Sequence, residues 1–195
     1  HNFSDSVIVF DEAQTLPAEL TKTTLKAVNA LCSLFRSTVV FSTATQPEFS
    51  CIDGLEWNPC EIVSSKKFLF SETKRTTLNM ELSKTLSFED IAERMSELDS
   101  VCCIVNKKAH SYELFNLLKD IVPDGCYHIS TDMCVEHRKN TLYEIHKRLE
   151  NREPCRVVST SCIEAGVDLD FENMFRALAP LEAIVQSAGR CNRNG

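Results

Sequence analysis

Four short segments of this sequence carry side chains that could bind or hydrolyse a phosphate ester. The first is Asp11-Glu12-Ala13-Gln14, which directly follows the apolar run at residues 7–10. At the carboxyl end of a buried strand, one acidic residue can hold the magnesium that bridges nucleotide phosphates, and a second can orient or activate a water molecule. An ordinary strand end with two solvated acids would have the same pattern, so this segment alone does not decide the function.

The second segment, Ser42-Thr43-Ala44-Thr45, follows the next apolar run at residues 39–41. Small hydroxyl side chains at a strand end can pass hydrogen bonds from a nucleotide site to a neighbouring domain. They are also common turn formers, so an ordinary turn is the alternative interpretation.

The third segment covers residues 159–168. Thr160 and the backbone amides beside it could face a phosphate of a nucleic-acid backbone. Gly166 allows a close approach or a positive φ angle, and Asp168 could bind a ribose hydroxyl or a catalytic arginine. The alternative is a glycine-containing loop with one solvated acid.

The fourth segment contains Gln186, Arg190 and Arg193. If it is helical, the two arginines are three residues apart on one face, and both could reach one polyphosphate. An arginine supplied across an interface raises the rate of phosphoryl transfer by about 10³–10⁵. A basic, solvated helix end is the alternative.

Short apolar runs alternate with longer amphipathic stretches, which predicts an α/β fold with parallel sheets. The continuously apolar residues 7–10 predict a strand that is buried on both faces. The pattern weakens between residues 51 and 86, and we place a boundary between two α/β units there, at residues 74/75. Further strands are predicted at residues 101–105, 126–129 and 156–159. The predicted core faces of the helices are Leu20, Val28, Leu31 and Phe35, then Tyr112, Phe115 and Leu118, then Leu142, Ile145 and Leu149.

Composition narrows the class of protein. The net charge of −7 argues against a simple basic nucleic-acid clamp, although a local cleft can still be positive. No apolar run approaches the ~18 residues of a membrane span, and the first residues do not resemble a signal peptide, so we predict a cytoplasmic protein. Ten cysteines occur without any Cys-x-x-Cys pair, which predicts free, mostly buried thiols and no zinc. The adjacent Cys102 and Cys103 should point to opposite faces of one strand.

Order and spacing bring the four segments together. Each follows an apolar strand, and in sequence they resemble motifs II, III, V and VI of superfamily-two helicases. Within that superfamily the chain resembles the CRISPR-associated helicase-nuclease of type I systems. The segments that carry this resemblance are residues 10–17, 42–47, 105–109, 129–134 with 137–138, 164–171, 178–181 and 186–193, and above all the Gly189-Arg190-Cys191-Asn192-Arg193 ending.

This resemblance implies two RecA-like parallel-sheet domains, an incomplete first one at residues 1–74 with motifs II and III and a nearly complete second one at 75–195 with motifs IV, V and VI. It implies an ATP-dependent helicase that moves along single-stranded DNA exposed by a CRISPR surveillance complex. ATP would be bound by Asp11, Glu12, Gln14, Gly166, Asp168, Gln186, Arg190 and Arg193, with magnesium on Asp11 and Glu12. Domain coupling is expected at Ser42, Thr43, Ala44 and Thr45, and nucleic-acid binding at Asn106, Ser130, Thr131 and Thr160.

Two departures from the superfamily pattern qualify this expectation. No Gly-x-x-x-x-Gly-Lys-Ser/Thr phosphate loop occurs among the 195 residues, and Ser187 stands where the wider superfamily usually has arginine. We therefore expect a fragment of a longer gene product that is inactive alone, with a bare apolar sheet edge beside residues 42–45. Arg190 and Arg193 should act on ATP held by the other domain. A superfamily-two RNA or DNA helicase outside CRISPR defence, or a non-catalytic nucleic-acid-binding remnant, remains the alternative.

Overall fold

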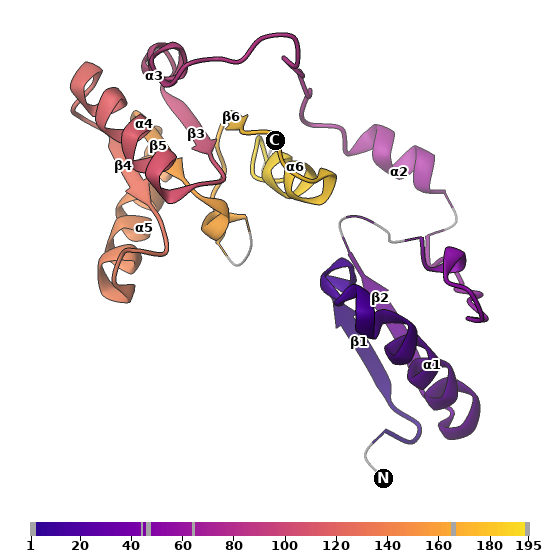
Figure 1. Cartoon of the computed structure of the whole chain (residues 1–195). Helices are drawn as coiled ribbons and strands as arrows, with labels where there is room; N and C mark the ends of the chain where they lie inside the picture. The colour runs from indigo at the N-terminus through magenta and orange to yellow at the C-terminus, as the bar shows by residue number, and fades with distance from the viewer. Residues whose placement is uncertain (1–2, 44, 46–47, 64, 165–166, 194–195) are drawn as a thin grey trace. The chain divides into compact units, whose positions relative to one another are not determined.

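The structure is a computed structural model that describes residues 3–43, 45, 48–63, 65–164 and 167–193. The chain divides into two compact units, His1–Ser71 and Glu72–Gly195, which are treated separately below. This division falls three residues before the boundary expected from the sequence. Figure 1 shows the first unit in indigo to purple and the second in magenta to yellow.

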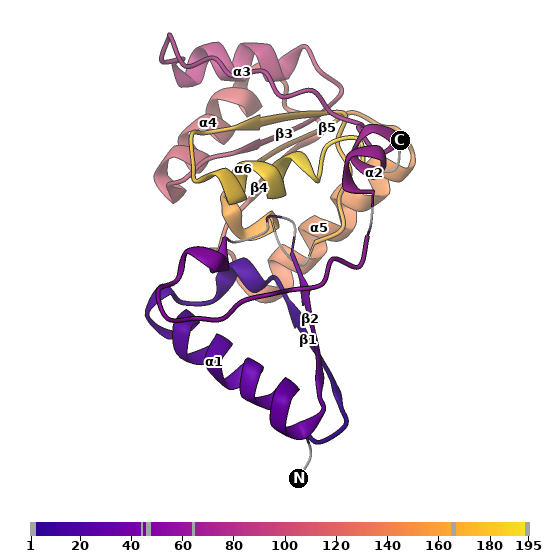
Figure 2. The ribbon, with the colours of Figure 1, turned by 90° about the vertical axis from the view of Figure 1, so that its right-hand side faces the viewer.

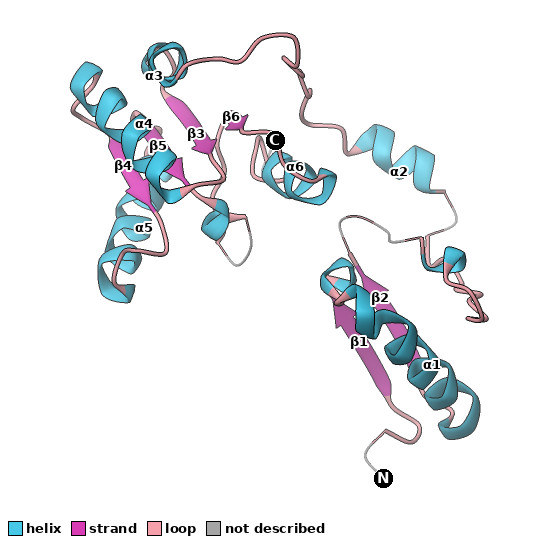
Figure 3. Cartoon of the chain, in the orientation of Figure 1, coloured by secondary structure: helices cyan, strands magenta, loops and turns pink. Residues whose placement is uncertain are grey.

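The first unit is a strand–helix–strand arrangement. Its strands pair in parallel, in register from Val7 with Thr38 to Asp11 with Ser42. Figure 3 shows the long helix α1 lying along this pair. The described elements are, in chain order, β1 (Val7–Asp11), a 3-10 helix (Ala13–Thr15), α1 (Ala18–Phe35), β2 (Thr38–Ser42), a second 3-10 helix (Phe49–Cys51) and α2 (Lys66–Glu72), whose last residue belongs to the second unit.

Aromatic rings cover one face of this two-stranded sheet. Phe10 and Phe41 are paired in register, and their rings stack with centroids 5.1 Å apart. Trp57 packs edge-on against Phe41 at 5.2 Å. Val7 and Val9 point to the opposite face, because side chains alternate along a strand, and they are 70% and 60% exposed. The prediction that residues 7–10 are buried on both faces was therefore wrong.

The buried stripe of α1 also differs from the predicted one. Thr21, Leu25 and Val28 are buried, whereas Leu20 and Phe35 are 57% and 45% exposed. Leu20 lies about 100° around the helix from Thr21, outside the stripe that faces the sheet. Phe35 is the last helical residue, so no further turn extends past it.

The second unit contains a four-stranded parallel sheet in the order β4-β5-β3-β6. Figure 2 shows α4 and α5 beside this sheet. Its described elements are α3 (Phe88–Ser96), β3 (Ser100–Ile104), α4 (Lys108–Ile121), β4 (Cys126–Ile129), α5 (Val135–Glu150), β5 (Cys155–Ser159), a 3-10 helix (Ser161–Ile163), β6 (Asn173–Arg176) and α6 (Leu181–Ala188).

Two hydrophobic clusters lie on the two faces of this sheet. One contains Cys102 of β3 together with Ile145 of α5, and the other contains Cys103 together with Leu114 of α4. The prediction that the adjacent cysteines point to opposite faces is confirmed. The predicted face of α4 was partly wrong, because Leu118 is buried but Tyr112 is 61% exposed. None of the helices in the described part of the chain is long and apolar enough to cross a membrane.

Candidate nucleotide and nucleic-acid sites

The carboxyl end of β1 carries the two predicted acidic residues. Asp11 is the last residue of the strand, and Glu12 follows it with φ 51° and ψ 46°. A residue other than glycine rarely adopts this left-handed conformation, which costs about 1–3 kcal/mol. The Glu12 amide donates to Asp11 Oδ1 at 3.0 Å. This turn therefore brings two exposed carboxylates to one strand end.

A chain of hydrogen bonds joins Glu12 to the segment after β2. Gln14 Nε2 donates to Glu12 Oε2 at 2.5 Å, and the Thr43 hydroxyl contacts Gln14 Oε1. The same hydroxyl lies 2.7 Å from the Thr45 carbonyl oxygen and accepts from the Thr45 amide at 3.2 Å. A hydroxyl has one hydrogen to donate, so Thr43 can donate to Gln14 or to the Thr45 carbonyl but not to both at once.

Strand register explains why these two segments meet. Asp11 pairs with Ser42, so β1 and β2 end at the same edge of the sheet, where open α/β folds place their ligands. Ser42 is exposed at this edge. Ala44, the remaining residue predicted for domain coupling, lies outside the described residues.

The donor set at this edge fits the predicted magnesium. Mg²⁺ takes hard oxygen ligands and is usually bound by one or two carboxylates together with phosphate oxygens and water. Asp11 and Glu12 supply two solvent-exposed carboxylates, and the backbone turn between them holds both at the strand end.

In the second unit, the predicted arginines lie beyond a helix and not within one. Helix α6 ends at Ala188, so the prediction that a helical turn presents Arg190 and Arg193 together was wrong. The chain is held instead by short parallel pairing with Phe171, whose amide donates to the Arg190 carbonyl at 3.0 Å and whose carbonyl accepts from the Asn192 amide at 2.8 Å. Gln186 is half-buried in the last turn of α6.

Side-chain contacts join this arginine segment to the loop that contains Asp168. Arg193 Nη1 lies 2.8 Å from Asp168 Oδ1, and Arg190 Nη2 donates to the Glu164 carbonyl at 3.0 Å. The Arg193 amide donates to Asp170 Oδ1 at 2.6 Å. The structure therefore brings together two of the segments that the sequence singled out. Gly166, which was predicted to bind the nucleotide, lies outside the described residues.

The four residues predicted to bind nucleic acid follow three neighbouring strands. Asn106 follows β3, Ser130 and Thr131 follow β4, and Thr160 follows β5, so all four lie at the carboxyl edge of the sheet. Asn106 and Thr131 are exposed. Ser130 and Thr160 are only 1% and 7% exposed, so in this conformation little of either side chain reaches solvent.

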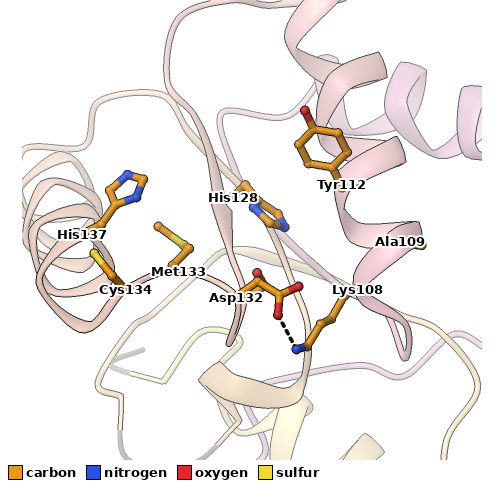
Figure 4. Close-up of a pocket in the computed structure, with 9 residues that line it drawn as sticks. Lys108, Ala109, Tyr112, His128, Asp132, Met133, Cys134 and His137 are labelled. Atoms are coloured by element: carbon orange, nitrogen blue, oxygen red, sulfur yellow. Dashed lines mark hydrogen bonds and ion pairs between the residues drawn. The ribbon is translucent and has the colours of Figure 1, made fainter.

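A cavity of about 450 Å³ opens at the same edge, between the first turns of α4 and α5. An ion pair between Lys108 and Asp132 lies along one side of it, as Figure 4 shows. His128 Nε2 lies 3.0 Å from the Ser111 hydroxyl, and burial lowers the pKa of this histidine below its ordinary value. Lys108 and Asp132 lie within segments that carry the family resemblance, but no site role was predicted for them from the sequence. His128 and Ser111 were not singled out, because a lone histidine and a lone serine carry no distinctive spacing.

The cysteines do not follow the predicted burial. Only Cys102, Cys103 and Cys155 are buried, and four others are exposed, so the expectation of mostly buried thiols was wrong. Burial raises the pKa of Cys103 to about 12, which keeps it a protonated core side chain. In the described ranges no three His, Cys, Asp or Glu side chains are grouped as metal ligands; the absence of zinc stays a prediction.

Three further residues contact the arginine segment of the second unit or a residue bound to it. Glu164 lies within a segment that the sequence singled out but was given no role there, and Arg176 and Arg75 were not predicted as site residues. Arg176 at the end of β6 and Glu164 form a buried ion pair, and Arg75 donates to the Arg193 carbonyl. Arg176 and Arg75 are isolated basic residues outside any motif, and only the fold brings them next to the arginine segment.

Solved structures show which known proteins share this fold. The structure of T. fusca Cas3 with AMPPNP matches 96% of this chain and 27% of that chain, with a TM-score of 0.66 and 19% identity. A structure described as a CRISPR RNA-guided surveillance complex, pre-nicking, matches 95% of this chain and 28% of that chain, with a TM-score of 0.61 and 18% identity. The predicted fold class is confirmed: α/β units with parallel sheets of the RecA-like fold.

Sequence comparison then identifies the family. The family model described as CRISPR-associated nuclease/helicase Cas3, C-terminal, matches residues 97–195, which are 99 of the 195 residues. The CRISPR-associated nuclease/helicase Cas3 of Methanothermobacter thermautotrophicus is 23% identical over 199 residues, covering 96% of this chain. The chain belongs to the Cas3 family, as its motifs predicted. It spans 24% of that relative's length.

Proposed function

We propose that this chain is one part of a longer ATP-driven motor that moves along single-stranded DNA in type I CRISPR interference. Family membership supports the assignment to a CRISPR-associated helicase. The observation that carries the motor function is the anchoring of Arg190 and Arg193. Backbone pairing with Phe171 and contacts to Glu164 and Asp168 hold two guanidinium groups within four residues at one site.

The acidic turn in the first unit supports the hydrolytic step of this proposal. The Gln14 amide holds one carboxylate oxygen of Glu12, and Glu12 would orient the water that attacks the terminal phosphate. Asp11 would hold magnesium, which when bound neutralises charge on the phosphates. The Thr43 hydroxyl, with its two alternative acceptors, would pass a change at Gln14 to the segment after β2.

Arg190 and Arg193 would stabilise the negative charge that develops on the phosphates during transfer, because a guanidinium binds phosphate oxygens through two parallel hydrogen bonds. Asp168 already holds the Arg193 guanidinium at 2.8 Å. Arg193 would therefore exchange this contact for a phosphate, which makes Asp168 a resting partner of the arginine.

The proposed nucleic acid and the proposed protein partner follow from the same assignment to a CRISPR-associated helicase. Asn106 and Thr131 are exposed at the carboxyl edge of the second sheet and would contact the sugar-phosphate backbone of single-stranded DNA, which binds without reading sequence. A match to a CRISPR surveillance complex structure supports such a complex as the partner that exposes the strand. This activity on foreign DNA would take place in the cytoplasm.

Replacement of Glu12 by glutamine in the intact protein tests the proposal. Glu12→Gln keeps the size of the side chain but removes the charge that orients water. We expect kcat for DNA-stimulated ATP hydrolysis to fall by about 10²–10⁴, while the affinity for a fluorescent ATP analogue changes by less than about threefold. Glu19→Gln is the matched control, because Glu19 is an exposed carboxylate in the first turn of α1.

Three other outcomes would contradict parts of the proposal. A Glu12→Gln variant that turns over at the parent rate would remove Glu12 from the hydrolytic step. Stimulation by single-stranded RNA but not DNA would indicate a helicase outside CRISPR interference. An intact protein that binds DNA but hydrolyses no ATP would indicate a non-catalytic remnant.

A further inference from the structure

A buried ion pair lies behind the predicted nucleotide and nucleic-acid residues of the second unit. Arg176 is the last residue of β6, and its Nε lies 2.9 Å from Glu164 Oε1, a charge contact without hydrogen-bond alignment. The two side chains are only 10% and 8% exposed. Charges this buried are costly unless they are paired, so the position of each constrains the other.

The other side of Arg176 binds the residue that follows β3. Arg176 Nη1 donates to Asn106 Oδ1 at 2.6 Å and to the Ala177 carbonyl at 2.9 Å. The opposite end of the Asn106 amide donates to the Leu178 carbonyl at 2.7 Å. Both ends of the Asn106 side chain are therefore occupied, and Arg176 fixes one of them.

Glu164 in turn binds the segment that carries the arginines. Its Oε1 lies 3.1 Å from the Ser187 hydroxyl, which can donate its one hydrogen either to this carboxylate or to the Ala183 carbonyl at 2.8 Å. The Glu164 carbonyl accepts from Arg190 Nη2 at 3.0 Å. Ser187 is 1% exposed, so the side chain at this position is packed against the carboxylate. The positive charge that balances Glu164 comes from Arg176, the last residue of β6, whereas Glu164 follows the 3-10 helix Ser161–Ile163.

These contacts form one continuous series from Asn106 through Arg176 and Glu164 to Ser187 and Arg190. We propose that Arg176 is a positioning residue, which through Glu164 holds the DNA-contacting end of β3 and the ATP-directed arginine segment in one fixed arrangement. The inference rests on the proposed function and deepens it, because Arg176 touches neither ligand but links the residues assigned to each. A movement of Asn106 on DNA would then be transmitted through the Arg176 side chain to Glu164, whose carbonyl binds Arg190.

A double variant in which both charged side chains are made neutral, called the neutral pair below, distinguishes a positioning role of Arg176 from a role in folding. The double variant Arg176→Gln/Glu164→Gln leaves no unpaired buried charge, so it should fold with a thermal midpoint close to that of the parent. We expect its kcat for DNA-stimulated ATP hydrolysis to fall by about 10- to 100-fold, because small misplacements of catalytic groups have effects of this size. The affinity for an ATP analogue should change by less than about threefold, since that binding does not depend on the coupling.

Two companion variants complete the experiment in the intact protein. Arg176→Lys keeps the charge but cannot bind Glu164 and Asn106 in the same geometry, so it should also lose DNA stimulation even if the neutral pair unfolds. Arg94→Gln/Glu81→Gln is the matched control, because this ion pair is 43% and 55% exposed and lies outside the series. It should retain the parent rate.

The possible results distinguish this inference from the proposed function. If the parent hydrolyses ATP on DNA and the folded neutral pair or Arg176→Lys does so within about threefold of the parent, the positioning role is wrong and the motor function stands. If the parent itself shows no DNA-stimulated hydrolysis, the proposed function fails, and this inference fails with it.

Discussion

Replacement of Arg193 by alanine should separate catalysis from stability in this protein. Arg193 contacts Asp168 at 2.8 Å, and the two side chains are 46% and 79% exposed. The backbone amide of residue 193 donates to Asp170, a contact that alanine keeps. Arg193→Ala therefore removes one exposed ion pair and leaves the path of the chain unchanged.

The expected magnitudes differ for the two measurements. Exposed ion pairs contribute roughly 0–1 kcal/mol to stability, so the free energy of unfolding should fall by less than about 1 kcal/mol. A catalytic arginine in phosphoryl transfer is worth about 10³ or more in rate, which corresponds to about 4 kcal/mol of transition-state stabilisation. We therefore expect kcat to fall at least about 10³-fold.

The assay is ATP hydrolysis by the intact protein at saturating ATP and single-stranded DNA, with urea unfolding of the same samples. Arg94→Ala is the control, because its ion pair with Glu81 at 3.0 Å is similarly exposed and lies outside the site. If Arg193→Ala keeps kcat within a few-fold of the parent, Arg193 is not catalytic. If it unfolds like a core variant, its contact with Asp168 is structural.

Three further predictions concern stability and reactivity. Burial raises the pKa of Cys103 to about 12, so its thiolate fraction at pH 8 should be about 10⁻⁴. Iodoacetamide should therefore leave Cys103 unmodified while the exposed cysteines react. Peptide mass spectrometry that finds Cys103 alkylated in the folded protein would contradict this. Burial lowers the pKa of His128 below its ordinary value of 6.5, so the unfolded state binds the proton first and the free energy of unfolding should decrease as the pH falls below about 6.5. The variant His128→Gln should show a smaller decrease when urea unfolding is compared at pH 7.5 and 5.5. A pH dependence unchanged by the substitution would contradict this role of His128. Gly125 has φ +72°, and a Cβ at this position would lie 2.4 Å from the Pro154 carbonyl oxygen, so Gly125→Ala should lower the free energy of unfolding by at least about 2 kcal/mol. Gly54→Ala should lower it less, because φ there is +68° but the nearest atom is 3.7 Å away. Equal losses in the two variants would exclude the clash with Pro154.

The sequence was sufficient for the fold class because short apolar runs alternate with longer amphipathic stretches, although the apolar run at residues 7–10 is exposed on one face. The residues of β5 are all buried, as its apolar core Val157 and Val158 predicted. By contrast, β6 was not predicted, because Asn173-Met174-Phe175-Arg176 is short and has polar ends. Its position at the edge of the sheet comes from long-range pairing, which no local pattern records.

The candidate site could be predicted to the level of segments but not of contacts. Asp11, Glu12 and Gln14 were recognisable from their place after an apolar strand, whereas the left-handed turn at Glu12 is a backbone feature that residue types do not predict. Arg190 and Arg193 were recognised as a pair for the wrong reason. Their spacing suggested a helical turn, but the chain leaves α6 at Ala188 to pair with Phe171.

The most direct test of the central claim is displacement of streptavidin from the end of a biotinylated single-stranded DNA by the intact protein. A motor that couples ATP hydrolysis to movement should displace streptavidin with ATP and not with a non-hydrolysable analogue, and Glu12→Gln should abolish displacement while Glu19→Gln retains it. Displacement that is equal with ATP and with the analogue, or none at all from a protein that binds the DNA, would contradict the account.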